Sequence, residues 1–173
     1  QRCQQHGQQW TGSEAGLDPA NPHPHGKVPA LLHDGVLIHE QAAIVLYLTD
    51  LCPEAGLGPR IGDAQRGPYL TWLAYYAGVV EPAFVSRFLN TDVPRGTAGW
   101  VKVEEVVAHL EVTLKDRPFL LGDAFSGADV LYGGTFAMFG QSPIMPQSMV
   151  IADYAKRCVA RPANARAQAR DDG

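Results

Sequence analysis

Hydrophobic and polar residues in the first third of the chain follow a pattern that predicts a β-hairpin. A short apolar run at residues 30–32 precedes His33-Asp34-Gly35, and a second apolar run follows at residues 36–38. Asp-Gly is a strong two-residue turn signal because both residues tolerate positive φ. We therefore expect residues 30–32 and 36–38 to pair as antiparallel strands.

Apolar residues after the hairpin recur with helical spacing. A first helix is expected from Glu40 to Leu51, where apolar residues repeat at i, i+4 and i+7. Pro53 should end this helix, because the residue before a proline disfavours the helical backbone conformation. The Gly- and Pro-rich stretch at residues 56–59 then marks a domain boundary.

The part of the chain beyond this boundary is predicted to be all-helical. The expected helices span residues 62–88, 99–115, 126–139 and 149–160, with a last polar turn after Pro162. Pro82 should kink the first of them, because proline removes a backbone donor from the helix. Ser126 and Asp129 have the spacing of a capping box, in which the serine caps the helix and the acid bonds back to the serine backbone.

Composition and charge restrict the partners. The 173 residues include 14 Lys and Arg against 18 Asp and Glu, a formal net charge of −4. This balance argues against a nucleic-acid partner, which requires basic patches. The longest apolar run, residues 42–48, is far shorter than the roughly 20 residues of a membrane span, and no signal peptide is recognisable. Three scattered cysteines without a Cys-x-x-Cys pair favour a cytoplasmic location.

Four motifs, in the right order, carry a family resemblance. Residues 21–31 resemble the Asn-Pro-x-Gly-x-Val-Pro-Ala-Leu stretch of the cytosolic glutathione S-transferase family, with two residues inserted before the Gly. Residues 36–48 look like the strand, Glu-Ser pair and helix start that follow in the family. Residues 122–130 are similar to the Gly-x-x-Phe-Ser-x-Ala-Asp helix start of its C-terminal domain. Residues 161–163 match an Arg-Pro-Ala tail of bacterial members.

The resemblance implies an α/β plus all-α fold, with an incomplete thioredoxin-like N-terminal lobe followed by an all-helical C-terminal domain. Residues 21–56 would form the partial glutathione-binding lobe and residues 62–173 the helical domain. Residues 1–20 are expected to be poorly ordered or non-homologous, because too few residues precede Asn21 for the family's first strand, helix and second strand. The resemblance also implies a homodimer.

The resemblance further implies a site for glutathione, the co-substrate of the family. The implied glutathione-binding residues are Lys27, Val28, Pro29, Glu40 and Gln41. A cis Val28-Pro29 bond would let the Val28 backbone pair with the cysteinyl part of glutathione. Glu40 suits the ammonium and the helix start at Gln41 suits the α-carboxylate of the γ-glutamyl group. Lys27 could reach the glycyl carboxylate.

Two departures from the family pattern affect this site. The family's Ser after Glu is Gln41 here, which keeps a backbone N–H but replaces a short hydroxyl with a longer side chain. The family's thiol-activating Tyr, Ser or Cys belongs to its first strand and helix, which residues 1–20 do not resemble. Cys3 and Ser13 are the only nearby candidates of the right type, and the catalytic residue is unassigned.

Three functions stay open on this evidence. The first is transfer of the glutathione thiolate to a small hydrophobic electrophile, with the protein supplying positioning and control of the thiol pKa. The alternative is a degenerate or truncated, non-catalytic relative that binds ligands or proteins. An isomerase or dehalogenase on the same fold is the third, because a fold does not fix the substrate.

Two further groups of residues have both a functional and a structural interpretation. Trp72, Tyr75 and Tyr76 belong to an electrophile pocket or, more often for such clusters, to core packing. The histidines at positions 23, 25, 33 and 39 suggest a metal, but His-x-His in a Pro-rich loop is a weak signal. No metal site is therefore expected.

Overall fold

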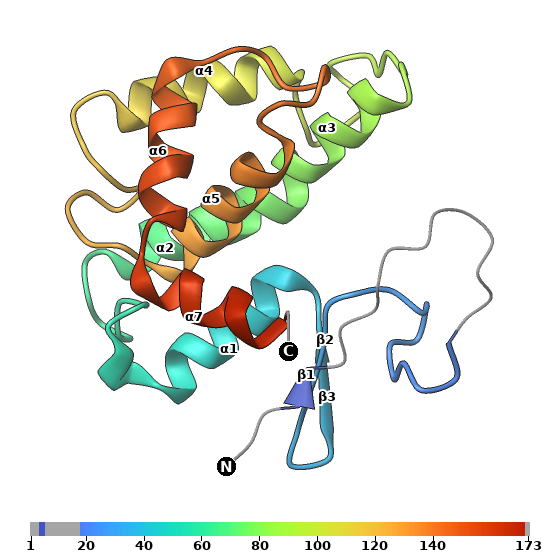
Figure 1. Ribbon diagram of the computed structural model, residues 1–173. Coiled ribbons are helices and arrows are strands. Elements are labelled where there is room, and N and C mark those ends of the chain that lie inside the picture. Colours follow the sequence, from blue (N-terminus) through green and yellow to red (C-terminus); the bar gives the residue numbers. More distant parts are fainter. Residues whose placement is uncertain (1–3, 6–17, 172–173) are drawn as a thin grey trace.

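Two regions of different architecture follow one another along the chain in the computed structural model, which describes residues 4–5 and 18–171 (Figure 1). The first region contains strands β1 (Gln4–Gln5), β2 (Ala30–His33) and β3 (Val36–His39), helix α1 (Gln41–Leu51) and the short 3-10 helix η1 (Pro53–Ala55). The second contains α2 (Arg66–Tyr75), the π-helix η2 (Tyr76–Val80), α3 (Glu81–Phe88), α4 (Val103–Leu114), α5 (Gly127–Phe139), α6 (Met149–Val159) and α7 (Pro162–Asp171). The predicted α/β plus all-α fold is confirmed. Within the described residues, no helix combines the length and the apolar character that a membrane span requires.

The predicted hairpin is present. Strands β2 and β3 pair antiparallel, with Ala30 opposite His39, and the turn residues Asp34 and Gly35 have φ of 48° and 79°. Strand β1 pairs antiparallel with the other edge of β2. The sequence predicted irregular structure through residue 20. This prediction was wrong for Gln4 and Gln5, which form β1. The pairing uses backbone N–H and C=O groups on the edge of β2. The side-chain pattern does not reveal such groups, so the sequence did not predict the strand.

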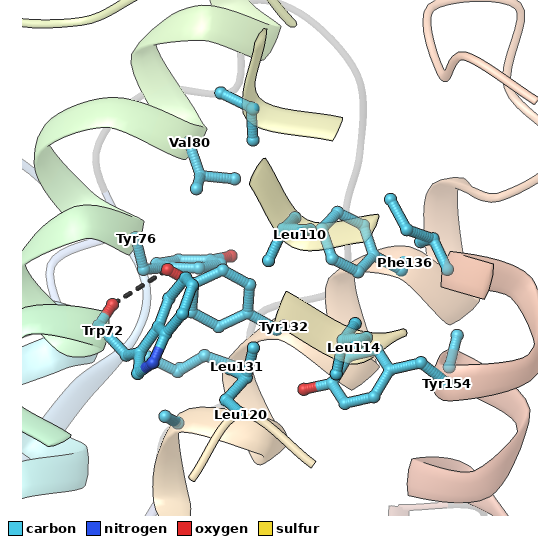
Figure 2. Close-up of a cluster of buried hydrophobic side chains, with 14 of the residues drawn as sticks. Trp72, Tyr76, Val80, Leu110, Leu114, Leu120, Leu131, Tyr132, Phe136 and Tyr154 are labelled. Atoms are coloured by element: carbon cyan, nitrogen blue, oxygen red, sulfur yellow. Dashed lines mark hydrogen bonds between the residues drawn. The ribbon is translucent and has the colours of Figure 1, made fainter. Parts of the chain in front are cut away.

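The core lies in the helical region, where α5 packs against α6 and α2 (Figure 2). The predicted apolar stripe of α4 is buried at every position, namely Val103, Val106, Val107, Leu110 and Leu114. Tyr132 of α5 is fully buried, and its hydroxyl donates a hydrogen bond of 2.9 Å to the carbonyl of Trp72, drawn as a dashed line in Figure 2. Such a bond removes the cost of burying a phenol group among apolar side chains.

The two regions approach each other closely where α1 crosses the start of α5. The Gly127 N–H donates to the Leu57 carbonyl at 2.7 Å, and a Cβ at position 127 would lie only 2.5 Å from the Val45 side chain. The buried hydroxyls of Thr49 and Tyr69 are 3.0 Å apart. A side chain at position 127 would collide with Val45, Tyr69 and Thr49, so the missing side chain lets the start of α5 pack directly against side chains of α1.

The segment 62–88, predicted as one helix kinked at Pro82, is instead three consecutive helical pieces. An α-helix, α2, passes into the π-helical turn η2 and then into α3, in which Pro82 occupies the first turn. A proline is tolerated in a first turn because its missing N–H has no intrahelical partner there. The irregularity that the proline predicts therefore lies in the turn before it.

Candidate functional site

A pocket of about 400 Å³ collects all five residues that the sequence implied for glutathione binding. Its walls come from the loop before β2, from the start of α1 and from η2 and α3 of the helical region. The lining residues are His23, His25, Lys27, Val28, Pro29, Glu40, Gln41, Ala77 and Glu81. The pocket thus lies between the two regions, and groups from both of them face it.

The loop before β2 presents backbone to the pocket. The Val28-Pro29 peptide bond is cis, as predicted. The paired register of the hairpin begins at Ala30, so Val28 lies beyond the last ladder pair, and its side chain is 44% exposed. The side-chain amide of Asn21 donates to the Lys27 carbonyl at 3.0 Å and fixes the loop from behind. A backbone in this position can pair with an extended peptide-like ligand.

The start of α1 forms the opposite wall. Glu40 is the residue before the helix and has φ of 70° and ψ of 121°, a backbone conformation that residues with a side chain seldom adopt. Its carboxylate makes no capping bond to the helix and is largely exposed, with the His39 ring 3.2 Å away. The first N–H groups of a helix and its dipole attract an anion. Strained backbone of this kind is common at binding sites, where the surrounding structure stabilises it.

Glu81 enters the pocket from the helical region, and the sequence analysis missed it. The Gln41 side-chain amide donates to the Glu81 carboxylate at 3.3 Å across the boundary between the regions. Burial raises the pKa of Glu81, and the charge of Glu40 raises it further. No local motif marks Glu81, because 40 residues separate it from Gln41 and only the tertiary fold brings them together.

The histidines divide into two groups. His23 is buried, and its ring lies edge-on to that of His39 with centroids 4.9 Å apart. The His39 Nδ1 atom is 3.2 Å from the Glu40 carboxylate, and His25 lies on the same loop as His23. His33 instead bonds to the Tyr47 hydroxyl at 2.7 Å, away from the pocket. Two of the four histidines, His23 and His39, therefore lie close to each other and to the Glu40 carboxylate.

The aromatic cluster fits its packing interpretation. Trp72 and Tyr76 are 9% and 3% exposed within the helical core, and the Tyr76 hydroxyl bonds to Thr135. Tyr75 is half-buried and stands edge-on to Trp72 and to His109. None of the three aromatic residues is among those that line the 400 Å³ pocket. An electrophile-binding role for these residues stays a prediction.

The capping residues of α5 are present in the predicted arrangement. The Ser126 N–H and hydroxyl both donate to one oxygen of Asp129, each at 2.8 Å. The other oxygen accepts from the Leu120 N–H and the Tyr154 hydroxyl, each at 2.9 Å. Asp129 is fully buried, so these four donors replace water around the carboxylate. Cys3 and Ser13, the candidate activators of the thiol, lie outside the described residues.

A second hollow, of about 570 Å³, lies at the far end of α3 and contains none of the predicted residues. Its cations are paired with neighbouring carboxylates: Arg87 with Glu104, Arg95 with Glu105 and Lys102 with Asp92. These exposed pairs neutralise one another, so the hollow offers little net charge to a ligand. The chemistry-bearing groups are concentrated in the smaller pocket.

Comparisons with known proteins show which family this chain resembles. The family model described as "Glutathione S-transferase, C-terminal domain" matches residues 93–157. Glutathione S-transferase GstA of Escherichia coli O157:H7 is 33% identical over 119 residues, which cover 67% of this chain and 59% of that protein. The probable glutathione S-transferase GSTU6 of Oryza sativa subsp. japonica is 30% identical over 140 residues, covering 74% and 58%. The chain thus spans somewhat over half the length of these curated relatives.

Solved structures give the same result over more of the chain. A glutathione transferase from Methylococcus capsulatus superposes with a TM-score of 0.69 at 30% identity, covering 86% of this chain and 75% of that one. A sphingomonad glutathione S-transferase complexed with glutathione superposes with a TM-score of 0.63 at 32% identity, covering 83% and 73%. The shared fold includes both the partial sheet region and the helices.

Proposed function

The chain belongs to the glutathione S-transferase family, and we propose that the 400 Å³ pocket binds glutathione and presents its thiolate to a small hydrophobic electrophile. One observation carries this proposal: the cis Val28-Pro29 bond, Glu40 and the start of α1 face one cavity. Glutathione-bound relatives of the same fold support it. Residues 21–56 would form the glutathione-binding lobe and residues 62–173 the helical domain that completes the pocket.

In this proposal each pocket group takes one part of the tripeptide. The Val28 backbone pairs with the cysteinyl unit, Glu40 binds the ammonium, and the first N–H groups of α1 at Gln41 bind the α-carboxylate. Lys27 is exposed at the rim, where its long side chain can reach the glycyl carboxylate. Glu81 holds the Gln41 side chain aside, which leaves room that the longer amide would otherwise occupy.

The reaction would be nucleophilic attack by the bound thiolate on the electrophile. Binding both reactants in one pocket supplies positioning, and the helix start favours negative charge nearby. A thiol activator among residues 1–20 would lower the thiol pKa from about 8.5. A homodimer is also part of the proposal, and the exposed apolar side chains of Val85 and Phe88 on α3 supply surface for a second copy.

Isothermal titration of the chain with glutathione, in a buffer that contains a metal chelator, tests the binding step. We expect one saturable site that Glu40→Ala weakens at least about tenfold, the effect of losing one charge-assisted bond. Asp34→Asn is the matched control, because Asp34 is an exposed carboxylate on the hairpin outside the pocket. Equal affinity of wild type and Glu40→Ala would refute the site.

Turnover with a chloronitrobenzene electrophile separates the transferase from a non-catalytic relative. The absorbance of the conjugate is followed with wild type and with Glu40→Ala at saturating glutathione. Conjugation well above the uncatalysed rate supports the transferase. Glutathione binding without acceleration would instead support the alternative, a ligand-binding protein on the same fold.

A further inference from the structure

Two residues that line the pocket, His23 and Glu40, lie close to a third side chain of a metal-ligating type, that of His39, which directly precedes Glu40 in the sequence. The ligand atoms of His23, His39 and Glu40 all lie within 4.8 Å of one another. Imidazole nitrogen and carboxylate oxygen are ligands of Zn²⁺ and related divalent ions. We propose that His23, His39 and Glu40 form a binding site for a divalent transition-metal ion such as Zn²⁺.

The four histidines at positions 23, 25, 33 and 39 suggested a metal, but the only local motif among them, His23-x-His25, is a weak signal, and no metal site was predicted. In the structure, His23 lies close to His39 and Glu40. His39 ends β3, and Glu40 follows it with positive φ, so the His39 ring and the Glu40 carboxylate meet at 3.2 Å. His23 reaches them from the preceding loop, with its ring 4.9 Å from that of His39.

The loop around His23 is already ordered by hydrogen bonds. The His23 N–H donates to the Asn21 side chain at 3.0 Å, and its carbonyl accepts from the Gly26 N–H at 2.9 Å. The His23 side chain is buried, while His39 is half-buried and Glu40 is exposed. A ligand set with one fixed member and two adjustable ones needs only small side-chain rotations to close around an ion.

The charges around the pocket favour a cation beside Glu40. Glu40 and Glu81 both line the cavity, and the charge of Glu40 helps to raise the pKa of Glu81. A divalent ion beside Glu40 would offset the repulsion between the two carboxylates. Lys27 also lines the pocket, but it is exposed, so its ammonium can stay in water.

Metal binding at His23 exchanges one hydrogen bond. The His25 N–H donates to His23 Nδ1 at 3.0 Å, and an ion at Nδ1 would take that lone pair. His25 is exposed, so its N–H can then bond to water. Three protein ligands leave one tetrahedral position open to solvent, which predicts weaker binding than in a closed four-ligand zinc site.

Zinc titration followed by calorimetry tests the site on the full chain, without glutathione or chelator. We expect wild type to bind one equivalent, with affinity reduced at least about tenfold in His39→Gln and in Glu40→Gln. Asp34→Asn is the matched control, since Asp34 belongs to a second His–carboxylate pair, with His33 at 3.9 Å, and should bind as wild type. His39 and Glu40 are not buried, so both variants should fold, and thermal melts verify this.

The proposal is overturned if wild type does not bind zinc, or if His39→Gln binds it as tightly as wild type. The second result would place the ion elsewhere, for example on cysteines. Absorption of the Co²⁺-loaded chain tests the ligand types. We expect no intense thiolate charge-transfer band, because the proposed donors are nitrogen and oxygen, and a strong band near the ultraviolet would contradict the site.

The proposed metal site overlaps the proposed glutathione site at Glu40, but each has its own test. If both exist, zinc should weaken binding of S-methylglutathione, which has no free thiol to capture the ion. Zinc is titrated without glutathione, and glutathione is titrated with chelator, so either proposal can fail while the other holds. An affinity for S-methylglutathione that zinc does not change would show that Glu40 does not bind both ligands.

Discussion

At the scale of single residues, Asp129 shows how a charge is accommodated inside this protein. Its carboxylate is fully buried and has no cationic partner among the described ion pairs, but it accepts bonds from four donors at the start of α5. Charge-assisted hydrogen bonds are the strong ones, and they replace the lost hydration of the carboxylate. Asp129 thus fastens α5 to α6 and to the preceding loop.

Asp129→Asn should destabilise the protein by about 2–4 kcal/mol, because the amide replaces an acceptor oxygen with a donor and leaves buried donors unpaired. Urea denaturation measures the free energy of unfolding. Asp123→Asn is the matched control, since Asp123 is exposed on the same loop and should change stability by less than about 0.5 kcal/mol. A stability for Asp129→Asn within that smaller range would contradict the assigned role.

Cys52 and Cys158 should differ sharply in reactivity. Cys52 is exposed after α1, whereas burial raises the pKa of the Cys158 thiol to about 12. Only the thiolate is nucleophilic, so at pH 8 about one Cys158 in ten thousand is reactive. We expect iodoacetamide to label Cys52 within minutes and to spare Cys158, as measured by peptide mass spectrometry. Labelling of Cys158 should rise about tenfold per pH unit, and equal labelling of the two at pH 8 would refute the difference.

At the scale of elements, neighbouring glycines on α5 have opposite roles. A Cβ at Gly133 would lie 2.3 Å from the Cβ of Cys158 on α6, whereas one at Gly134 would meet no atom within 4 Å. Of these two glycines, only Gly133 is required by the close approach of α5 and α6. At position 134 the glycine only lowers helix propensity.

Gly133→Ala should lower the free energy of unfolding by about 1–3 kcal/mol, because an added methyl overpacks the crossing. Gly134→Ala is the matched partner and should raise it by up to about 1 kcal/mol, since alanine favours the helix. Thermal melts of the two variants provide the measurement. Destabilisation of similar size at both positions would mean that the α5–α6 packing is not the cause.

The elements were largely predictable from the sequence because their signals are local. Asp34-Gly35 set the hairpin turn, and Ser126 with Asp129 set the start of α5. The π-helical turn at Tyr76–Val80 was not predictable, since a proline announces a disturbance but not its form. Strand β1 was missed because it depends on a partner edge rather than on its own residues.

At the scale of the whole molecule, the two regions should unfold together. The contacts that join them include Gly127 with Leu57, Thr49 with Tyr69, Gln41 with Glu81, and the paired bonds of 2.6 and 2.8 Å from Arg66 to Asp50. We expect one urea transition, with the same midpoint by far-ultraviolet circular dichroism and by tryptophan fluorescence. Two separated transitions would show that these contacts do not couple the regions.

Only the part of the candidate site that lies in local sequence motifs was predictable. Residues 27–29, Glu40 and Gln41 lie in short motifs and were identified, whereas Glu81 reaches the pocket only through the packing of the regions. The meeting of His23 with His39 likewise depends on the path of a loop past the hairpin. Spacing in the sequence predicts contacts within one helix or strand. The pairs Gln41–Glu81 and His23–His39 each join two separate segments, so spacing could not predict them.

The π-helical turn also fixes the rotational phase of the long segment from α2 to α3. Each residue of an α-helix advances the side-chain direction by about 100°, and a π-turn accommodates one residue more than an α-turn. The extra residue lets Trp72 and Leu73 point into the core while Glu81, on the same continuous rod, points into the pocket. If the same residues formed a regular α-helix, Glu81 would be turned by about 100° relative to Trp72 and Leu73, and one of the two faces would lose its partner. The one extra residue in the π-helical turn thus allows the same segment to supply side chains to both the core and the pocket wall.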